Sequence, residues 1–271
     1  ASTSYTWLVD TTAPSVSISD TPAAETNSQA ADMTVTSADE NDGSGLASTT
    51  CTIDGTGTTC GDALANLAEG SHTYVATATD DAGNSASASY TWLVDTTAPS
   101  AAITSTFAWD NDGSVTITYT ASDDSSGIAS CTLTMSDAQT ADCSGGDGSA
   151  TFTMADAAAA TADISIADVA GNTADSTTFT FGVDDTDPSA DVTSDLTWDN
   201  DGSVTITYTA SDGGSGIASC TLTLSDGQTA DCSGGDGSAS FDMDDGSGYT
   251  ASISLTDVAG NSADGASSDT F

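Results

Sequence analysis

Apolar and polar residues alternate along much of this chain with a period of two. In the segment 115–120, Val, Ile and Tyr alternate with Thr, and the same rule returns in segments 164–166 and 179–183. Such alternation is typical of strands with one buried face, and clusters of Gly, Asp, Asn and Ser mark turns between them. The pattern predicts strands in the middle of the chain at 100–107, 114–122, 128–135, 139–143, 150–154, 162–168 and 176–184, with at most one helical turn over 155–162.

This strand pattern occurs more than once. Residues 4–14 return unchanged as 89–99, an offset of 85, and residues 109–119 match 198–208, an offset of 89. A period of this length is a whole domain rather than a solenoid repeat. Seven short strands in each unit favour an all-β fold class of tandem immunoglobulin-like β-sandwich domains. We predict an orphan final strand at 1–10, followed by Ig-like domains at 11–97, 98–186 and 187–271, the last with an incomplete final strand.

The charge of the chain excludes several classes of function. None of the 271 residues is Lys or Arg, against 41 Asp and Glu and one histidine, which gives a net charge of −41. Nucleic-acid binding and attachment to an anionic membrane by a basic patch both need Lys or Arg. No apolar run is long enough for a transmembrane helix. We expect no salt bridge, so the cation that neutralises the carboxylates comes from solvent, either as a bound divalent ion or, in a halophilic setting, as salt that screens them.

An enzymatic function is not expected. No Lys or Arg is present to act as a base or to hold a substrate, and the single histidine, His72, stands at the start of a predicted strand, where we expect it at the surface. The four tryptophans, Trp7, Trp92, Trp109 and Trp198, recur at repeat positions. That recurrence favours packing in cores or interfaces over stacking on sugars, which a carbohydrate-binding module would need.

The six cysteines come in one local pair per unit: Cys51 with Cys60, Cys131 with Cys143, and Cys220 with Cys232. Each pair flanks a turn between two predicted strands, so a disulfide across a hairpin is expected, and it would stabilise the unit by about 3 kcal/mol. Zinc binding is the alternative, but one histidine in the whole chain disfavours it. Even pairing in every repeat predicts an extracellular or cell-surface location. Residues 1–5 lack the features of a signal peptide, so we interpret the chain as a mature or excised piece.

Several motifs resemble those of the bacterial Ig-like repeats of large secreted surface adhesins. They are residues 5–14 (Tyr-Thr-Trp-Leu-Val-Asp-Thr-Thr-Ala-Pro), 80–84 (Asp-Asp-Ala-Gly-Asn), 43–47 leading into 51–55, and 69–74. The resemblance covers all three units and is fullest in the first; the second replaces Ile-Asp-Gly with the residues 133–137, and the third does likewise. It implies an Ig-like module that serves as a stalk rather than as an adhesive tip.

Carboxylates gather at one end of each predicted domain. The entering linker, the B–C loop and the F–G loop of an Ig-like sandwich lie at the same end, and oxygen ligands from three segments suit calcium. We therefore predict a Ca²⁺ site at each domain junction that stiffens the array. The predicted ligands are Asp10, Asp39, Glu40, Asp42, Asp80, Asp81 and Asn84 in the first unit; Asp95, Asp123, Asp124, Asp168 and Asn172 in the second; and Asp184, Asp185, Asp187, Asp212, Asp257 and Asn261 in the third.

The alternative is that these Asp and Asn residues only build turns, which both residue types favour. The same choice arises at the Asp-Asn-Asp-Gly segments 110–113 and 199–202. They resemble the start of a calcium loop, but the downstream Glu of an EF-hand is missing. There we favour a hairpin turn.

The two ends of the sequence are complementary. Residues 2–10 duplicate a final strand with no domain body before them, and residues 269–271 stop where the second unit continues. One hypothesis is a window cut from a longer repeat protein. The other is a filament subunit in which residues 2–10 enter the third domain of the next chain by donor-strand exchange. Both predict an extracellular fibre or adhesin stalk whose partners are copies of itself or further Ig-like repeats, head to tail, with any glycan or cell-surface target unknown.

Overall fold

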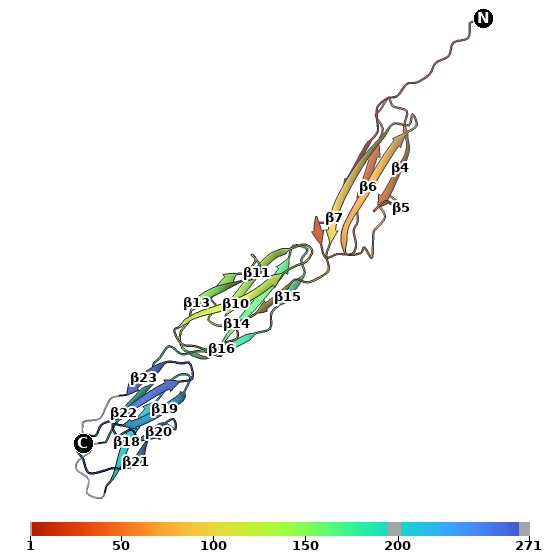
Figure 1. The fold of residues 1–271 in the computed structure, drawn as a ribbon. Coiled ribbons are helices and arrows are strands. Elements are labelled where there is room, and N and C mark those ends of the chain that lie inside the picture. Colours follow the sequence, from red (N-terminus) through yellow and green to blue (C-terminus); the bar gives the residue numbers. More distant parts are fainter. Residues whose placement is uncertain (1, 195–201, 266–271) are drawn as a thin grey trace.

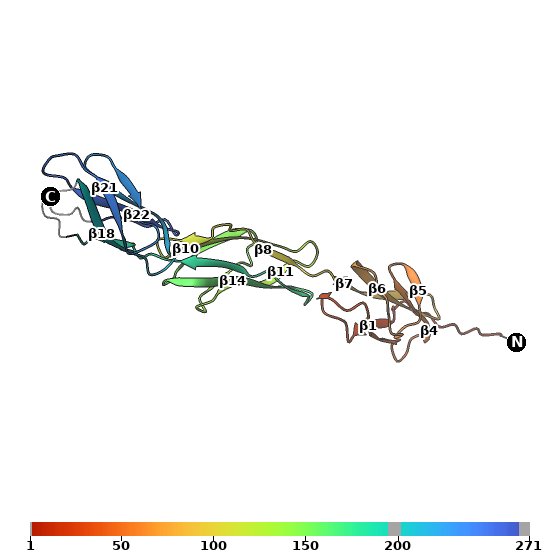
Figure 2. The same ribbon diagram turned by 90° about the horizontal axis from the view of Figure 1, so that it is seen from below.

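The computed structural model describes residues 2–194 and 202–265, and all regular structure in them is β-strand. The strands form three sandwiches, over residues 15–94, 100–183 and 189–265, which we call units 1, 2 and 3. Figures 1 and 2 show the units end to end in an elongated array, with units 1 and 3 at opposite ends. Within the described residues, no helix suited to crossing a membrane is present.

Unit 2 shows the sandwich most fully. One sheet has the order β13 (Gly148–Thr153), β10 (Ser114–Ser122), β8 (Ser100–Ile103). The facing sheet has the order β12 (Thr140–Asp142), β11 (Ile128–Met135), β14 (Ala157–Asp168), β16 (Phe179–Val183), β9 (Trp109–Asp110), and β15 (Thr173–Asp175) also pairs with β14. All of these pairs are antiparallel except β9 on β16, which is parallel. The chain thus passes from β8 in the smaller sheet to β9, which forms the edge of the larger sheet.

Units 1 and 3 follow the same plan. Unit 1 pairs β1 (Ser15–Ser19) with β3 (Thr34–Ala38) and faces them with β2 (Glu25–Thr26), β7 (Ser85–Val94), β6 (Gly70–Asp80), β4 (Leu46–Ile53) and β5 (Thr56–Thr58). Unit 3 has one sheet of β17 (Ser189–Val192), β18 (Ser203–Ser211) and β21 (Gly237–Asp242), and another of β20 (Thr229–Asp231), β19 (Ile217–Leu224), β22 (Ala251–Asp257) and β23 (Ser262–Gly265).

The alternating pattern predicts the strands well because it follows burial. In β10 every second residue is buried, with Ile117 fully so, and Leu133 and Ile164 complete the centre of the unit 2 core. Two predicted strands are shorter than expected: 100–107 ends at Ile103, where the chain crosses to the other sheet, and 176–184 forms only β16. The predicted helical turn over 155–162 is wrong, since β14 starts at Ala157 and its alanines pair with β16. Small side chains fit opposite Phe181, and this packing overrides the helix propensity of alanine.

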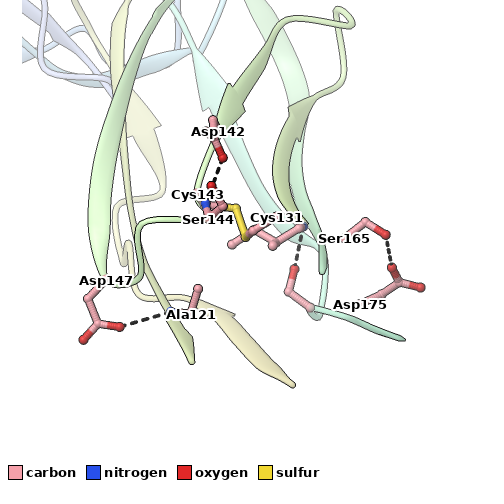
Figure 3. Close-up of a disulfide and its surroundings, with 10 residues drawn as sticks. Ala121, Cys131, Asp142, Cys143, Ser144, Asp147, Ser165 and Asp175 are labelled. Atoms are coloured by element: carbon pink, nitrogen blue, oxygen red, sulfur yellow. Dashed lines mark hydrogen bonds between the residues drawn. A yellow bond between two sulfur atoms is a disulfide. The ribbon is translucent and has the colours of Figure 1, made fainter. Parts of the chain in front are cut away.

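The three predicted disulfides all form: Cys51–Cys60, Cys131–Cys143 and Cys220–Cys232. Each ties the strand next to the edge of the larger sheet to the turn after the short edge strand. Figure 3 shows the pair in unit 2, where Asp142 accepts a hydrogen bond from the amide of Ser144 at 2.8 Å and Asp147 accepts one from the amide of Ala121 at 3.1 Å. The disulfide and these carboxylate-capped turns hold an edge that has few apolar side chains.

The histidine and the tryptophans differ from expectation in part. His72 is buried, at 8% exposure, and forms an ion pair with Asp54, so the predictions of a surface histidine and of a chain without salt bridges are wrong. The inward-facing register of β6 opposite Trp92 accounts for its burial. Trp92 lies in the core, and Trp109 packs on Gly182, where even one added carbon would clash with the ring. Trp7 is exposed, whereas Trp198 lies outside the described residues.

Candidate metal centre

The best-formed acidic site lies at the end of unit 2 that faces unit 1. Asp95 comes from the linker after β7, Asp123 from the loop between β10 and β11, and Asp168 from the end of β14. One oxygen atom from each of the three side chains lies within 4.8 Å of the other two. Three segments far apart in the sequence thus meet at one point, as the Ig-like topology predicts.

The loop 123–127 is folded around its own carboxylate. Oδ2 of Asp123 accepts hydrogen bonds from the amides of Ser125 at 3.1 Å and Gly127 at 2.6 Å. Gly127 has a φ of 85°, in the left-handed region that glycine adopts without steric cost. This conformation turns its N–H back toward Asp123. A non-glycine residue here would strain the backbone and weaken the loop.

The linker carboxylate is buried and held by the same loop. Asp95 has 0% exposure, and its two oxygens accept hydrogen bonds from the amides of Ser126 at 2.9 Å and Thr97 at 3.0 Å. Burial raises the pKa of Asp95, but donation by Ser126 and Thr97 outweighs it, so the pKa lies below its ordinary value. The linker therefore carries its negative charge into the junction.

The third carboxylate comes with an asparagine that fixes the linker. Asp168 accepts hydrogen bonds from the backbone and from the side-chain amide of Asn172, the latter at 2.7 Å. The same Nδ2 of Asn172 donates to the carbonyl of Asp95 at 2.8 Å and to that of Thr97 at 3.2 Å. Asn172 thus joins the F–G loop to the linker through its N–H groups. In this geometry its side-chain nitrogen positions the linker, and its side-chain oxygen as a calcium ligand stays a prediction.

Unit 3 repeats this site almost atom for atom. Asp184, Asp212 and Asp257 form the cluster, with Asp184 0% exposed and held by the amide of Ser215 at 2.6 Å. Asn261 donates to the carbonyl of Asp184 at 2.7 Å. The geometry of the two junctions is the same although their linker sequences differ.

Unit 1 departs from this arrangement. Its cluster is Asp10, Asp39 and Glu40, and the buried Asp80, which corresponds to Asp168, is not in it. Asp10 still accepts a hydrogen bond from the amide of Ser44 at 2.7 Å, and Asn84 still donates to the carbonyl of Asp10 at 3.2 Å. Hydrogen bonding by Ser44 is the main cause that lowers the pKa of Asp10. For Glu40 its own amide lowers the pKa, but burial and the neighbouring Asp39 outweigh it and raise the pKa.

Several predicted ligands lie outside the clusters. The side chains of Asp42, Asp81, Asp124, Asp185 and Asp187 are exposed. At the second candidate, Asp110 and Asp112 cap their own turn by accepting amide hydrogen bonds from Asp112 and Ser114. The segment is a turn, but the predicted hairpin is wrong, because β9 pairs with β16 while β10 pairs with β8 and β13 in the other sheet. Residues 199–201 of its copy lie outside the described residues.

One group of positioning residues was not predicted from the sequence: the serines Ser44, Ser126 and Ser215. Each donates its amide to the linker aspartate, and each hydroxyl accepts an amide hydrogen bond from the F–G loop, from Ala82, Ala170 and Ala259 respectively. The available signal was the recurrence of Ser-Gly in the same register of every unit. A serine before glycine was interpreted only as a turn.

The donor set fits a hard cation. Three carboxylates share each cluster, and the chain has no Lys or Arg to neutralise them. In addition, Oδ1 of Asp39 and Oδ1 of Asp212 are buried with no hydrogen-bond partner. A buried carboxylate oxygen without a donor is costly, and a cation would satisfy it. Calcium takes six to eight oxygens, so carbonyls and water would complete the shell.

Each linker also donates hydrogen bonds to an acidic side chain of the unit before it. Oε1 of Glu69 accepts hydrogen bonds from the amide of Thr96, at 2.8 Å, and from its hydroxyl. At the next joint Asp156 accepts from the amide of Asp185 at 2.9 Å and from the hydroxyl of Thr186 at 2.8 Å. Across the first joint the amide of Asn27 in unit 1 donates to the carbonyl of Ala170 in unit 2 at 3.1 Å. The candidate sites therefore lie where consecutive units are joined.

No family model and no curated protein matches the chain. Among solved structures, similar chains come from a bacterial ice-binding adhesin (19% identity, 94% of this chain and 96% of that one, TM-score 0.42) and from the tandem repeats in the extending region of a large adhesion protein (22% identity, 95% and 74%, TM-score 0.38). Fibronectin(III)-like modules of Clostridium thermocellum CbhA are similar as well (16% identity, 63% and 91%, TM-score 0.35). By their names, these neighbours are adhesin repeats and fibronectin(III)-like modules. The chain itself is a tandem array of Ig-like β-sandwich units.

Proposed function

We propose that this chain is an extracellular structural element, the stalk of a cell-surface adhesin, whose joints are stiffened by calcium. The observation that carries the proposal is the burial of a linker carboxylate in an all-acidic cluster at both described joints, Asp95 at the first and Asp184 at the second. The three disulfides suit an oxidising environment. The role is mechanical and not catalytic, since the one histidine is engaged in unit 1 by Asp54.

In this proposal the ion adds a bridge between parts that only hydrogen bonds join without it. The linker, the B–C loop and the F–G loop each supply one carboxylate, so a bound ion fixes the direction in which the chain enters the unit. Removing the ion leaves three like charges within 4.8 Å, which repel. The hydrogen bonds of Asn172 and Asn261 keep the linker in place, but they do not cancel this charge.

The test is thermal unfolding and electron microscopy of the oxidised chain at constant ionic strength, in calcium and then in chelator. Calcium at a hundredfold excess over its Kd would stabilise the folded chain by about 2.7 kcal/mol per site, and rods in calcium would become bent in chelator. Magnesium and sodium are the controls. Equal stability and equal shape under all four conditions would overturn the calcium sites and leave general screening of the acidity by salt.

A second candidate function, filament subunit, is favoured by the segment that precedes unit 1. Trp7 and Val9 are 78% and 76% exposed, whereas their copies Trp92 and Val94 in β7 are 1% and 0% exposed. The segment 2–10 thus repeats a sequence that is buried within a sheet in β7. We propose that it completes the third unit of a neighbouring copy by strand addition. Head-to-tail contacts of this kind generate filaments.

Deleting residues 2–9 tests this second candidate. If it is right, the full chain forms filaments much longer than three units, the deleted chain forms single short rods, and a peptide of residues 4–10 binds the deleted chain. Short rods from both chains would contradict it and favour covalently joined repeats. A carbohydrate-binding module has less support, because Trp92 is buried and Trp109 packs on Gly182.

A further inference from the structure

The one histidine of the chain lies at the end of unit 1 that is joined to unit 2. His72 is the third residue of β6, and it faces Trp92 of β7, with ring centroids 5.7 Å apart. Nothing in the metal clusters touches it. Its side chain is nevertheless buried and fully engaged by polar atoms.

Both ring nitrogens of His72 face atoms that accept hydrogen bonds. Nδ1 lies 2.7 Å from Oδ2 of Asp54, and Nε2 lies 2.8 Å from the carbonyl oxygen of Ala68. A carbonyl oxygen has no proton to donate, and an ionised carboxylate has none either. Neutral imidazole has one N–H and one lone pair, so it can satisfy only one of these partners. The geometry therefore requires both nitrogens to be protonated, which makes His72 an imidazolium.

The neighbouring charges agree with this protonation state. Oδ1 of Asp54 also accepts a hydrogen bond from the amide of Thr73 at 2.8 Å, and this amide, together with His72, lowers the pKa of Asp54. Burial lowers the pKa of His72, but the Ala68 carbonyl and Asp54 outweigh burial and raise the pKa above 6.5. Among the described residues, Asp54 makes the one ion pair with the ring. The nearest other acids on adjoining segments are Glu69, engaged by Thr96, and Glu25, whose strand pairs with β7.

The hydrogen bond to Ala68 connects His72 to the joint between units 1 and 2. Ala68 precedes Glu69, and Glu69 grips Thr96, the residue after the buried linker carboxylate Asp95. When the imidazolium loses a proton, the remaining N–H stays with the carboxylate, the stronger acceptor. Nε2 then has no proton to donate to the carbonyl of Ala68, so the hydrogen bond between them is lost.

We propose that His72 acts as a pH-sensitive latch on the joint. As an imidazolium, it holds residues 68–69 in place through the Ala68 carbonyl, and this in turn maintains the hydrogen bonds of Glu69 to Thr96 in the linker between units 1 and 2. Because the folded state favours the protonated ring, its stabilisation is complete below the ordinary histidine pKa and is lost as the pH rises through the raised one. Unit 2 has no such latch, since Ala160 and Phe181 stand in the register of His72 and Trp92.

Nuclear magnetic resonance of the full chain tests the proposal, with the ring nitrogens of His72 followed between about pH 5 and pH 9. We expect both nitrogens to carry protons at neutral pH, with a midpoint above 6.5. The exchange of the Thr96 amide, corrected for its intrinsic pH dependence, is expected to speed up across that same midpoint. The Asp185 amide, gripped by Asp156 at the other joint, is the internal control and is expected to show no such change.

The variant Asp54→Asn keeps an acceptor for Thr73 but offers the ring an N–H. We expect it to convert His72 to the neutral form with its proton on Nε2, to move the midpoint to 6.5 or below, and to abolish the pH response of Thr96 while the chain stays folded. His72→Gln is the second variant and removes the response altogether. A ring that is neutral at neutral pH in the unaltered chain, or a Thr96 amide that ignores the titration of the ring, would overturn the proposal.

Discussion

Each of the two joints has a carboxylate cluster of the same kind, but the residue that follows the buried linker aspartate differs between them. At the first joint Glu69 holds Thr96, which is neutral; at the second Asp156 holds Asp185, which carries a carboxylate of its own. Hydrogen bonding and repulsion from Asp156 raise the pKa of Asp185, while the amide of Asp185 lowers the pKa of Asp156. The same hydrogen bond from the linker to an acidic side chain thus forms at both joints, but with more negative charge around it at the second. We therefore expect the second joint to depend more on an external cation.

The largest expected effect comes from removing a cluster carboxylate at each joint. Asp95→Asn and Asp184→Asn are each expected to abolish about 2.7 kcal/mol of calcium stabilisation at a hundredfold excess of the ion. At one fixed calcium concentration, the loss of calcium stabilisation is expected to be greater for Asp184→Asn, because the greater negative charge around Asp184 favours tighter binding. Titration calorimetry and calcium-dependent melting measure this difference. Asp124→Asn, an exposed acid of the same B–C loop, is the matched control; a response equal to that of Asp95→Asn would show that only general charge matters.

A smaller effect is expected from exchanging the residues that differ. Asp185→Thr gives the second joint the residue of the first and removes the repulsion with Asp156, so in chelator its Tm is expected to rise by about 1–2 °C. Thr96→Asp performs the reverse change and is expected to lower the Tm. Calorimetric melting of both variants in chelator is the measurement. If both variants shift the Tm in the same direction, the difference between the joints has another origin.

The smallest difference between the joints is expected from the serines that link the two loops. Ser126→Ala and Ser215→Ala each remove one hydrogen bond from an F–G loop amide, at 3.3 Å and 3.0 Å respectively. A loss of about 0.5–1.5 kcal/mol is expected in each case, and it is expected to be alike at the two joints. Denaturant unfolding measures it. Unequal losses would mean that the joints differ in geometry as well as in charge.

Sequence reasoning succeeded where one residue type has one structural role. Alternation in β10 predicts its buried face, and cysteine spacing predicts the disulfides. It failed where tertiary context decides. The alanines at the start of β14 are good helix formers, yet they lie in a strand that pairs with β16, where Ala160 stands opposite Phe181. His72 was expected at the surface because its inward register depends on which residue of β6 pairs with Trp92.

The sequence predicted where the candidate site lies, but not the role of each residue in it. The topology of the sandwich brings Asp95, Asp123 and Asp168 together, and that topology follows from the strand pattern. The sequence does not distinguish an asparagine that offers oxygen from one that donates N–H groups, as Asn172 does. Nor does it show that the exposed Asp124, next to Asp123, points away from the cluster.

The parallel pairing at the edge of the larger sheet has a mechanical consequence. In unit 2 the amides of Gly182 and Asp184 donate to the carbonyls of Ala108 and Asp110, at 2.8 and 2.9 Å. In unit 1, Leu93 and Asp95 donate in the same way to Ala24 and Thr26. Tension applied between the ends of a unit draws such strands past each other lengthwise, so these bonds are loaded in shear and must break together, not one after another. A chain anchored at one end and pulled at the other would therefore resist at the edge of units 1 and 2, directly beside the acidic joints.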